Sequence, residues 1–353
     1  MNPQRRNEIL LFAFSMLSHG IFSSYFILKF SIARLATIYD AGIYTEIAKS
    51  GYPPTVEPAY SMFPMYPLLI RILGSFIGYH LAAVILVITL SSLSTVFFYR
   101  ICLQKSKYPL QLSFLFIFFP YAWMIVSSLP YSEPLFILFC LMTFYYMMNG
   151  KVYPASVVAS LATLTRTAGI LLIIPLFYSV YKSRKMRDAP IVFLPLIGLV
   201  LLFTFHWYLT GDFFAHIHAQ RAMGSDLPDG GTFLVYPFYF IAYFIQKGLT
   251  HLSYWRIIVM FAIYTIGILG IRKDKLLLIY SLPFYVLNIS LSQFPTFWFG
   301  LDRQLLPVFP FIFTYEKLLC ERGLWNRLLF IAVIIVSLYE AFRFLNRWCL
   351  LAP

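Results

Sequence analysis

Residues 8–30, "EILLFAFSMLSHGIFSSYFILKF", form an apolar run long enough to cross a bilayer, which takes about 20 residues. Arg5 and Arg6 precede the run, and no small-residue cleavage site separates it from the next polar stretch. We therefore predict a retained membrane-spanning helix rather than a signal peptide. Because basic residues mark cytoplasmic loops, this segment places the N-terminus in the cytoplasm and the following residues outside.

The rest of the chain has the composition of a multi-pass membrane protein. Of 353 residues, 60% are hydrophobic and 12% are charged, whereas a soluble domain is about 25% charged. The net charge of +13 indicates cytoplasmic loops that face anionic lipid; no nucleic acid partner is expected, since no basic, aromatic-rich stripe lies on a soluble domain. Four scattered cysteines suggest neither a disulfide framework nor a zinc site.

The apolar segments predict an all-α bundle in one domain, residues 1–353, with roughly 10–12 transmembrane or re-entrant helices. Further segments are expected at 79–101, 109–127, 134–148, 190–209, 255–271, 275–292, 303–319 and 326–345. Residues 154–187 begin and end on the cytoplasmic side but are too short to cross twice, which predicts either two short helices meeting near Arg166 or one helix that is only partly inserted. Residues 233–249 either cross the membrane, or re-enter it or lie on its outer interface, and the basic residues at 272–275 favour one of the last two arrangements.

This topology places external loops at residues 31–78, 210–232 and 293–302, with "SSLPYSEP" at 127–134 as an external turn. In the first loop, residues 39–50 have helical spacing. Glu46 precedes Lys49 by three positions on a polar face and is expected to be a surface acid. Asp40 shares its arc with apolar side chains, and so it is either a helix cap or a buried functional acid.

The second loop, "GDFFAHIHAQRAMG", predicts an interfacial helix with Asp212, His216 and Gln220 on one arc and Arg221 among the apolar residues. The spacing of Asp212 and His216 suits a metal ion, but two ligands alone favour a polar face over a cavity. Glu133 begins a helix after Ser132, where an acid favours the helix N-terminus.

Separate outward segments also carry cations. They are Arg34, Arg166, Arg221 and Arg303. Each alone could be an interfacial anchor. Together they could hold a lipid phosphate, while a carboxylate in a partly dry cleft could take a proton from an attacking hydroxyl.

Five stretches in order, within residues 39–312, resemble motifs of the PIG-V family, which comprises GPI mannosyltransferase 2 and prokaryotic relatives. They are "YDAGIYTEIAKSGY" followed by "FPMYPLLIR", then "YSEPLF", "TRTAGIL", "GDFFAHIHAQRAMG" and "LDRQLLPVFPFI". The resemblance implies a GT-C fold with a non-cytoplasmic site, a polyprenyl- or dolichyl-phosphate mannose donor, and inversion at the anomeric carbon. Asp40 matches the family's acid in the first external loop, which acts as the base or orients the acceptor.

The sequence departs from the family pattern at several motif positions. Tyr39 and Met223 replace tryptophans, Phe213 replaces a proline, and no tyrosine follows Arg303. The acceptor is therefore either a GPI precursor or another lipid-linked or surface glycan.

The sequence hypothesis is thus an integral membrane mannosyltransferase, in the plasma membrane of a prokaryote or the endoplasmic reticulum of a eukaryote. Asp40 is expected to be the catalytic base. Donor phosphate or sugar contacts are expected from Arg166, Arg303, Glu133 and Arg221. Acceptor or loop contacts are expected from His216, Gln220, Asp212 and Tyr44. Membrane lipids surround the enzyme, and the chemistry needs no cofactor, with a divalent cation near Glu133 as an alternative. The alternative functions are a transporter or flippase of a lipid-linked sugar, or a non-catalytic subunit in which Asp40 only caps its helix.

Overall fold

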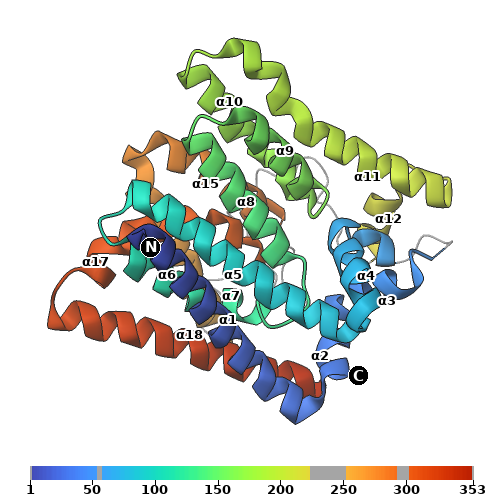
Figure 1. Ribbon diagram of the computed structural model, residues 1–353, viewed down its shortest axis with the longest axis horizontal. Helices are drawn as coiled ribbons and strands as arrows, with labels where there is room; N and C mark the ends of the chain where they lie inside the picture. The colour runs from blue at the N-terminus through green and yellow to red at the C-terminus, as the bar shows by residue number, and fades with distance from the viewer. Residues whose placement is uncertain (1, 54–57, 223–251, 292–301, 352–353) are drawn as a thin grey trace.

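The computed structural model describes residues 2–53, 58–222, 252–291 and 302–351. Every regular element within these ranges is a helix, as the sequence predicted (Figure 1). The segment at 233–249, whose crossing was left open, lies outside the described residues, as does most of the third predicted external loop.

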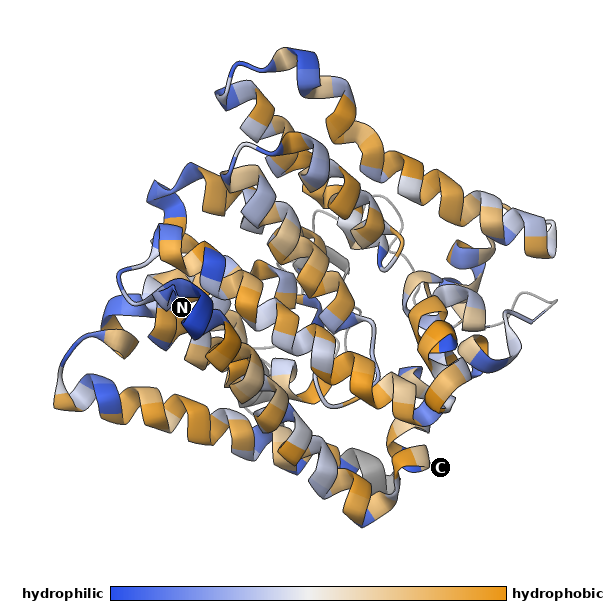
Figure 2. Ribbon diagram, viewed as in Figure 1, coloured by the Kyte–Doolittle hydropathy of each residue, from blue (hydrophilic) through white to orange (hydrophobic). Residues whose placement is uncertain are grey.

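Four described helices are long and apolar enough to cross a membrane. They are α1 (Pro3–Phe30), α5 (Tyr79–Lys105), the continuous pair η3 (Met186–Phe193) and α11 (Leu194–Thr210), and α18 (Leu324–Leu351). The outer faces of α1, α11 and α18 are apolar (Figure 2), and Leu28 is 88% and Trp325 80% exposed. So much exposed apolar surface suits lipid rather than water, which makes the described chain compatible with an all-α membrane protein.

Most other apolar helices are shorter than a full crossing. They include α4 (Met65–Ile77), α6 (Pro109–Phe118), α8 (Glu133–Met148), α9 (Val152–Thr163), α10 (Ile173–Lys182) and α15 (Lys275–Leu291). Among the described residues, helices long enough for a full crossing are therefore found for only part of the predicted set. The single segment predicted at 109–127 is wrong, because Pro120 separates α6 from α7 (Tyr121–Val126). Proline cannot donate the helical hydrogen bond and disfavours helical backbone at the residue before it.

The break predicted near Arg166 is confirmed. Arg166 has extended backbone (φ −158°, ψ 140°) between α9 and η2 (Thr167–Leu172), which leads into α10. Gly169 lets this turn pack tightly, because a Cβ there would lie 2.5 Å from the backbone nitrogen of Thr163. The chain thus folds back on itself with the Arg166 side chain at the point of reversal.

The centre of the bundle is α8, which packs against both α5 and α9 (Figure 1). Because the loop before α8 enters this centre, Ser127, Ser128 and Tyr131 are fully buried and Glu133 is 3% exposed. The turn predicted at residues 127–134 is present before α8 but is buried within the protein, and the side of the membrane on which it lies stays a prediction. Its polar residues face other protein segments instead of water.

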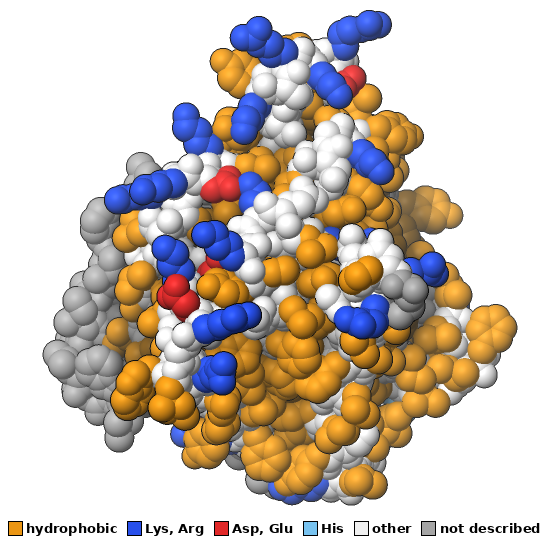
Figure 3. Space-filling view, turned by 60° about the vertical axis from the view of Figure 1, so that its left-hand side comes forward, with side chains coloured by type: hydrophobic (Ala, Val, Ile, Leu, Met, Phe, Trp, Pro, Cys, Tyr) orange, Lys and Arg blue, Asp and Glu red, His pale blue; other side chains and the backbone are white. Residues whose placement is uncertain are grey.

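One end of the bundle is basic. Glu8 on α1 pairs with Arg100 near the end of α5, and Lys105 pairs with Asp274, which precedes α15. Residues 272–275 therefore lie at the same end as Lys105, as the re-entrant interpretation of residues 233–249 requires. Figure 3 shows Lys and Arg side chains gathered on this face.

At the other end of α5 lie α2 (Ile32–Thr37), α3 (Asp40–Ser50), η1 (Pro58–Ser61) and α12 (Ala215–Ala222), next to α4 (Figure 1). Further along the chain lie the helices α14 (Leu252–Gly270), η4 (Ile271–Lys273), η5 (Leu306–Tyr315) and α17 (Glu316–Cys320). The predicted site residues Asp40, Tyr44, His216 and Gln220 are all on helices of this second end.

Candidate functional site

Asp40 is the first residue of α3, and its carboxylate does not cap the helix. The capping position is Tyr39, which makes no side-chain cap bond. The chain turns sharply from α2 into α3, and Gly42 permits the close approach, since a Cβ there would lie 2.6 Å from the carbonyl oxygen of Thr37. The Asp40 side chain is 22% exposed. This geometry favours the buried-acid alternative over the cap.

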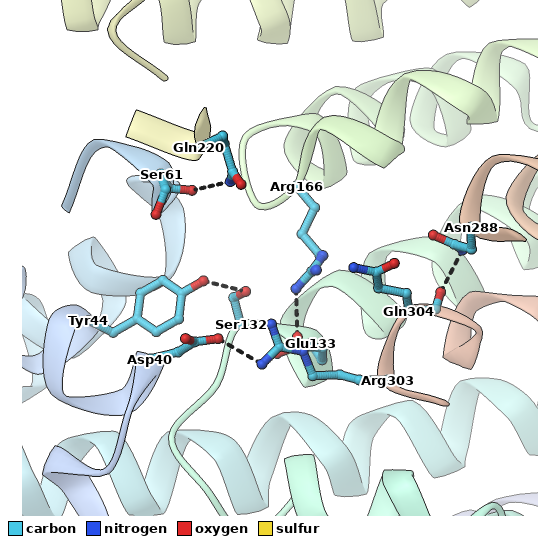
Figure 4. Close-up of polar contacts among 10 residues, drawn as sticks. All are labelled: Asp40, Tyr44, Ser61, Ser132, Glu133, Arg166, Gln220, Asn288, Arg303 and Gln304. Carbon is cyan, nitrogen blue, oxygen red and sulfur yellow. Dashed lines mark hydrogen bonds and ion pairs between the residues drawn. The ribbon is translucent and has the colours of Figure 1, made fainter. Parts of the chain in front are cut away.

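Asp40, Glu133, Arg166 and Arg303 form a four-charge cluster (Figure 4). Nη1 of Arg303 donates to Oδ2 of Asp40 at 2.7 Å. Nη1 of Arg166 donates to Oε1 of Glu133 at 2.6 Å. Nε of Arg303 lies 2.8 Å from the same Oε1, which is an ion-pair distance at an angle unsuited to a hydrogen bond. A single carboxylate oxygen thus joins both guanidinium groups.

Four separate segments supply this cluster. Asp40 opens α3, Glu133 opens α8, Arg166 lies at the reversal between α9 and η2, and Arg303 precedes η5. The Glu133 side chain is only 4% exposed, whereas those of Arg166 and Arg303 are 24% and 19% exposed. The carboxylate of Glu133 is therefore the buried anchor, and the two guanidinium groups keep an accessible side.

The cluster contains two formal positive and two formal negative charges. Burial opposes the charge on Arg303, but Glu133 and Asp40 outweigh it and raise the pKa of its guanidinium. Cζ of Arg303 also lies 5.2 Å from the centre of the Tyr131 ring, a cation–π contact. Arg303 is thus held as a cation between two carboxylates and one aromatic face.

Asp302, next to Arg303 in the chain, is a different kind of acid. Its carboxyl group is buried and has no hydrogen-bond partner among the described residues. Burial raises the pKa of Asp302 well above its usual range, which favours the neutral form. Burial thus disfavours a further negative charge beside the cluster.

Two hydrogen bonds brace the segments that carry the cluster (Figure 4). The Tyr44 hydroxyl lies 2.8 Å from Oγ of Ser132, and Nδ2 of Asn288 donates to the carbonyl oxygen of Gln304 at 2.7 Å. Tyr44 is only 4% exposed, so its position suits packing of α3 against the start of α8 rather than the predicted acceptor contact.

The polar residues of the second loop do not converge in the same way. His216 and Gln220 share a face of α12, where Nδ1 of His216 lies 3.0 Å from the Tyr60 carbonyl oxygen and Gln220 donates to that of Ser61 at 3.3 Å. Asp212 instead accepts from the backbone N–H of Phe214 at 2.8 Å and pairs with His218 at 2.6 Å. The structure does not assemble the metal pair Asp212–His216.

The remaining predicted cations lie outside the four-charge cluster. Arg221 is exposed on α12, and Arg34 lies on α2. Within the described ranges, no group of three or more His, Cys, Asp or Glu residues could hold a metal ion.

Sequence reasoning missed Tyr131 and Asn288 as neighbours of the cluster. Tyr131 is the first residue of the quoted "YSEPLF" motif, two positions before Glu133, so the motif pointed to this residue but not to its contact with Arg303. Asn288 lies in an apolar helix and brings no pattern of its own; its polarity within an apolar segment was the available hint. The sequence matches no protein-family model and no curated protein.

Proposed function

We propose that this chain is a membrane glycosyltransferase that moves a hexosyl residue, mannosyl by its motif resemblance, from a polyprenyl- or dolichyl-phosphate donor to a hydroxyl of a lipid-linked or surface glycan. The observation that carries the proposal is the junction of Asp40, Arg303, Glu133 and Arg166. A leaving phosphate needs cations and an attacking hydroxyl needs a base. The four-charge cluster offers both within hydrogen-bond distance.

The proposed step is an inverting displacement. The acceptor oxygen forms a bond to the anomeric carbon from the face opposite the phosphate, and the bond from that carbon to the phosphate oxygen breaks. The electron pair stays on the phosphate, while the hydroxyl proton passes to the Asp40 carboxylate. Before the step, Asp40 and the phosphodiester each carry one negative charge; afterwards Asp40 is neutral and the phosphate monoester carries both.

Arg303 suits this movement of charge. It pairs with Asp40 at 2.7 Å in the structure, and the need for that pairing ends when Asp40 takes the proton. The phosphate acquires its second charge in the same step, so a guanidinium group shifting from carboxylate to phosphate follows the charge. Arg166, on the other side of Glu133, supplies a second planar donor group. Both arginines have an accessible side for an incoming phosphate.

The proposed membrane setting follows from the distribution of basic residues. The end of the bundle with Arg100 and Lys105 faces the cytoplasm by the positive-inside tendency, and the four-charge cluster lies toward the opposite end of α5. Glu8 pairs with Arg100, which brings the N-terminal helix start to the cytoplasmic end. The donor's isoprenoid chain would remain in lipid while its phosphate reaches Arg166 and Arg303.

Donor consumption tests this proposal. The full-length protein in lipid nanodiscs is incubated with mannosyl-phospho-polyprenol and a pool of membrane lipid acceptors, and wild type is compared with Asp40→Asn. Loss of the base should slow transfer by about 10²–10⁴-fold. Glu321→Gln, an exposed acid, is the matched control and should transfer normally. Undiminished transfer by Asp40→Asn would contradict the base assignment. A wild type that never consumes the donor would contradict the transferase itself.

A further inference from the structure

A groove on the flank of α3 has no part in the proposed reaction. One face of α3, the turn at residues 51–53 and the start of η1 border an open groove of about 630 Å³, a volume within the range of small-ligand sites. The groove begins at Gly42 and Ile43, next to the turn of the helix that carries Asp40. It therefore adjoins the base without including it.

Among the described residues that line the groove, Glu46 is the charged one, and it is set among apolar walls that include Ile43, Ile47 and Tyr52. Glu46 is exposed, and its Oε1 accepts a hydrogen bond from Oγ of Ser50 at 2.5 Å, which orients the carboxylate. A carboxylate accepts hydrogen bonds from neighbouring hydroxyls, and apolar walls suit the C–H faces of a sugar ring. This combination favours a polyhydroxylated ligand.

The spacing along α3 links the groove to the cluster. Glu46 follows Asp40 by six residues, a rise of about 9 Å along a helix. Successive residues turn by about 100°, which puts Ile43 between the two acids on the helix surface. A chain of linked sugar rings could therefore pass over Ile43 with one ring at Glu46 and the next at Asp40.

We infer that this groove is the acceptor subsite: Glu46 accepts hydroxyl hydrogen bonds from the sugar ring that precedes the reacting one. The inference rests on the proposed function in taking Asp40 as the base. It gives Glu46, predicted from the sequence as a surface acid only, a role in substrate recognition. It also identifies the acceptor as a glycan of at least two linked residues.

Alkyl glycosides are suitable probes of the groove. Binding of hexyl mannoside and hexyl mannobioside to the full-length protein in nanodiscs is measured by titration calorimetry, with binding of a short-chain prenyl phosphate as a readout of the four-charge cluster. Glu46→Ala should weaken mannobioside binding at least about tenfold, the size of a lost hydrogen bond to a charged group. Ser50→Ala should have a smaller effect in the same direction. Prenyl phosphate binding and the Glu321→Gln control should be unchanged.

The variant Glu46→Gln distinguishes a glycan from a cationic headgroup as the ligand of the groove. An amide oxygen still accepts from hydroxyls, so glycoside binding should be partly retained, whereas a site for ammonium groups should lose its ligand. Stronger binding of hexylammonium than of mannobioside to wild type, with loss in the Gln variant, would overturn the inference. Equal mannobioside affinities of wild type and Glu46→Ala, or no saturable binding to wild type, would overturn it as well.

The two proposals can fail separately. If wild type consumes the donor but Glu46→Ala leaves the KM for the acceptor unchanged, only the acceptor subsite is wrong. If the donor is never consumed while mannobioside binding depends on Glu46, the transferase is wrong and the groove remains a glycan-binding site.

Discussion

The four-charge cluster and the polar face of α12, which carries His216 and Gln220, both lie in segments that the sequence predicts to face outward. Their side chains nevertheless have different kinds of partners. In the cluster, Arg166 and Arg303 meet on one oxygen of Glu133. On α12, His216 and Gln220 each bind a backbone carbonyl of η1. Burying ion pairs often costs as much as it gains, while bonds to backbone carbonyls satisfy groups that folding would otherwise leave unpaired. This difference is the reason that we propose the reaction at the cluster and a structural role for His216 and Gln220 on α12.

Among the variants that test this comparison, the largest effect is expected from Arg303→Gln. The change leaves Asp40 and Glu133 with Arg166 as the remaining cation of the cluster, so the site becomes negative and repels a phosphodiester. Transfer should fall by at least about 10²–10³-fold, as when one donor to a developing oxyanion is removed. Unfolding should become easier by about 3 kcal/mol, since two partly buried carboxylates lose a partner. Donor turnover and thermal unfolding in nanodiscs measure the two effects.

Arg303→Lys separates charge from geometry. Lysine restores the cation but cannot reach two acceptors with a planar fork. The variant should therefore recover most of the stability and only part of the transfer rate. Full recovery of the rate would show that Arg303 acts as a simple point charge.

A smaller and more selective effect is expected from Glu133→Gln. The amide keeps an oxygen for Arg166 but removes one negative charge, leaving the cluster with a net charge of +1. A phosphate then no longer competes with Glu133, so prenyl phosphate should bind more tightly. Transfer should nevertheless slow, because the arginines lose their common anchor and the product leaves less readily. A lower KM for the donor together with a lower kcat is a pattern that simple misfolding does not produce.

Weaker donor binding by Glu133→Gln would instead mean that Glu133 mainly keeps the arginines folded in place. Measuring the prenyl phosphate Kd and the melting temperature on the same samples distinguishes these outcomes. A double-mutant cycle with Arg166→Gln gives the coupling between the two side chains directly.

Much of the local structure could be predicted from the sequence. Periodicity and the Ser132–Glu133 junction predicted the helices α3 and α8 to within a residue, and basic residues at both ends of segment 154–187 predicted the reversal at Arg166. The convergence could not be predicted. Arg303 and Asp40 are 263 positions apart, and no periodic pattern connects such distant segments.

Two errors have clear physical causes. The apolar run at 109–127 predicted one segment, but Pro120 separates α6 from α7 because proline cannot donate the helical hydrogen bond and disfavours helical backbone at the residue before it. Helical spacing predicted Asp212 and His216 on one arc, but α12 begins at Ala215. Asp212 therefore lies before the helix, where helical angles do not apply.

On α12, His216→Ala should affect stability and not chemistry. His216 is 5% exposed, bonds to η1, and lies 4.8 Å from Phe63 between ring centres. Its loss should destabilise the fold by about 1–3 kcal/mol, the cost of removing a buried hydrogen-bond partner. Turnover per folded molecule should stay at the wild-type value. Gln220→Ala should act in the same direction and more weakly, because its bond to Ser61 is longer. A fall in kcat beyond the folded fraction would place α12 in the site.

The smallest effect is expected at Asp212, which precedes α12 and does not lie on the predicted helical arc. Burial acts to raise the pKa of Asp212, but hydrogen bonds from His218 and from the backbone N–H of Phe214 outweigh it, so the pKa is lowered from its usual value of 3.8. When the pKa of a carboxyl group is lower in the folded protein than in the unfolded chain, its charge stabilises the fold at any pH above the unfolded pKa. This stabilisation is lost as the pH falls through the folded pKa. Because the side chain is 30% exposed, screening limits the effect to less than about 1 kcal/mol.

Asp212→Asn isolates this contribution, because its side-chain oxygen can still accept from Phe214 while the charge is gone. The melting temperature of wild type should exceed that of the variant slightly at pH 6, and the difference should vanish below the folded pKa and shrink in high salt. Asp212→Ala should lose the turn bond at every pH, at a cost of about 1 kcal/mol. A difference that grew as the pH fell would mean a raised pKa, as for the buried Asp302, and the contrast between a local ion pair on α12 and a buried charge network around Glu133 would then fail.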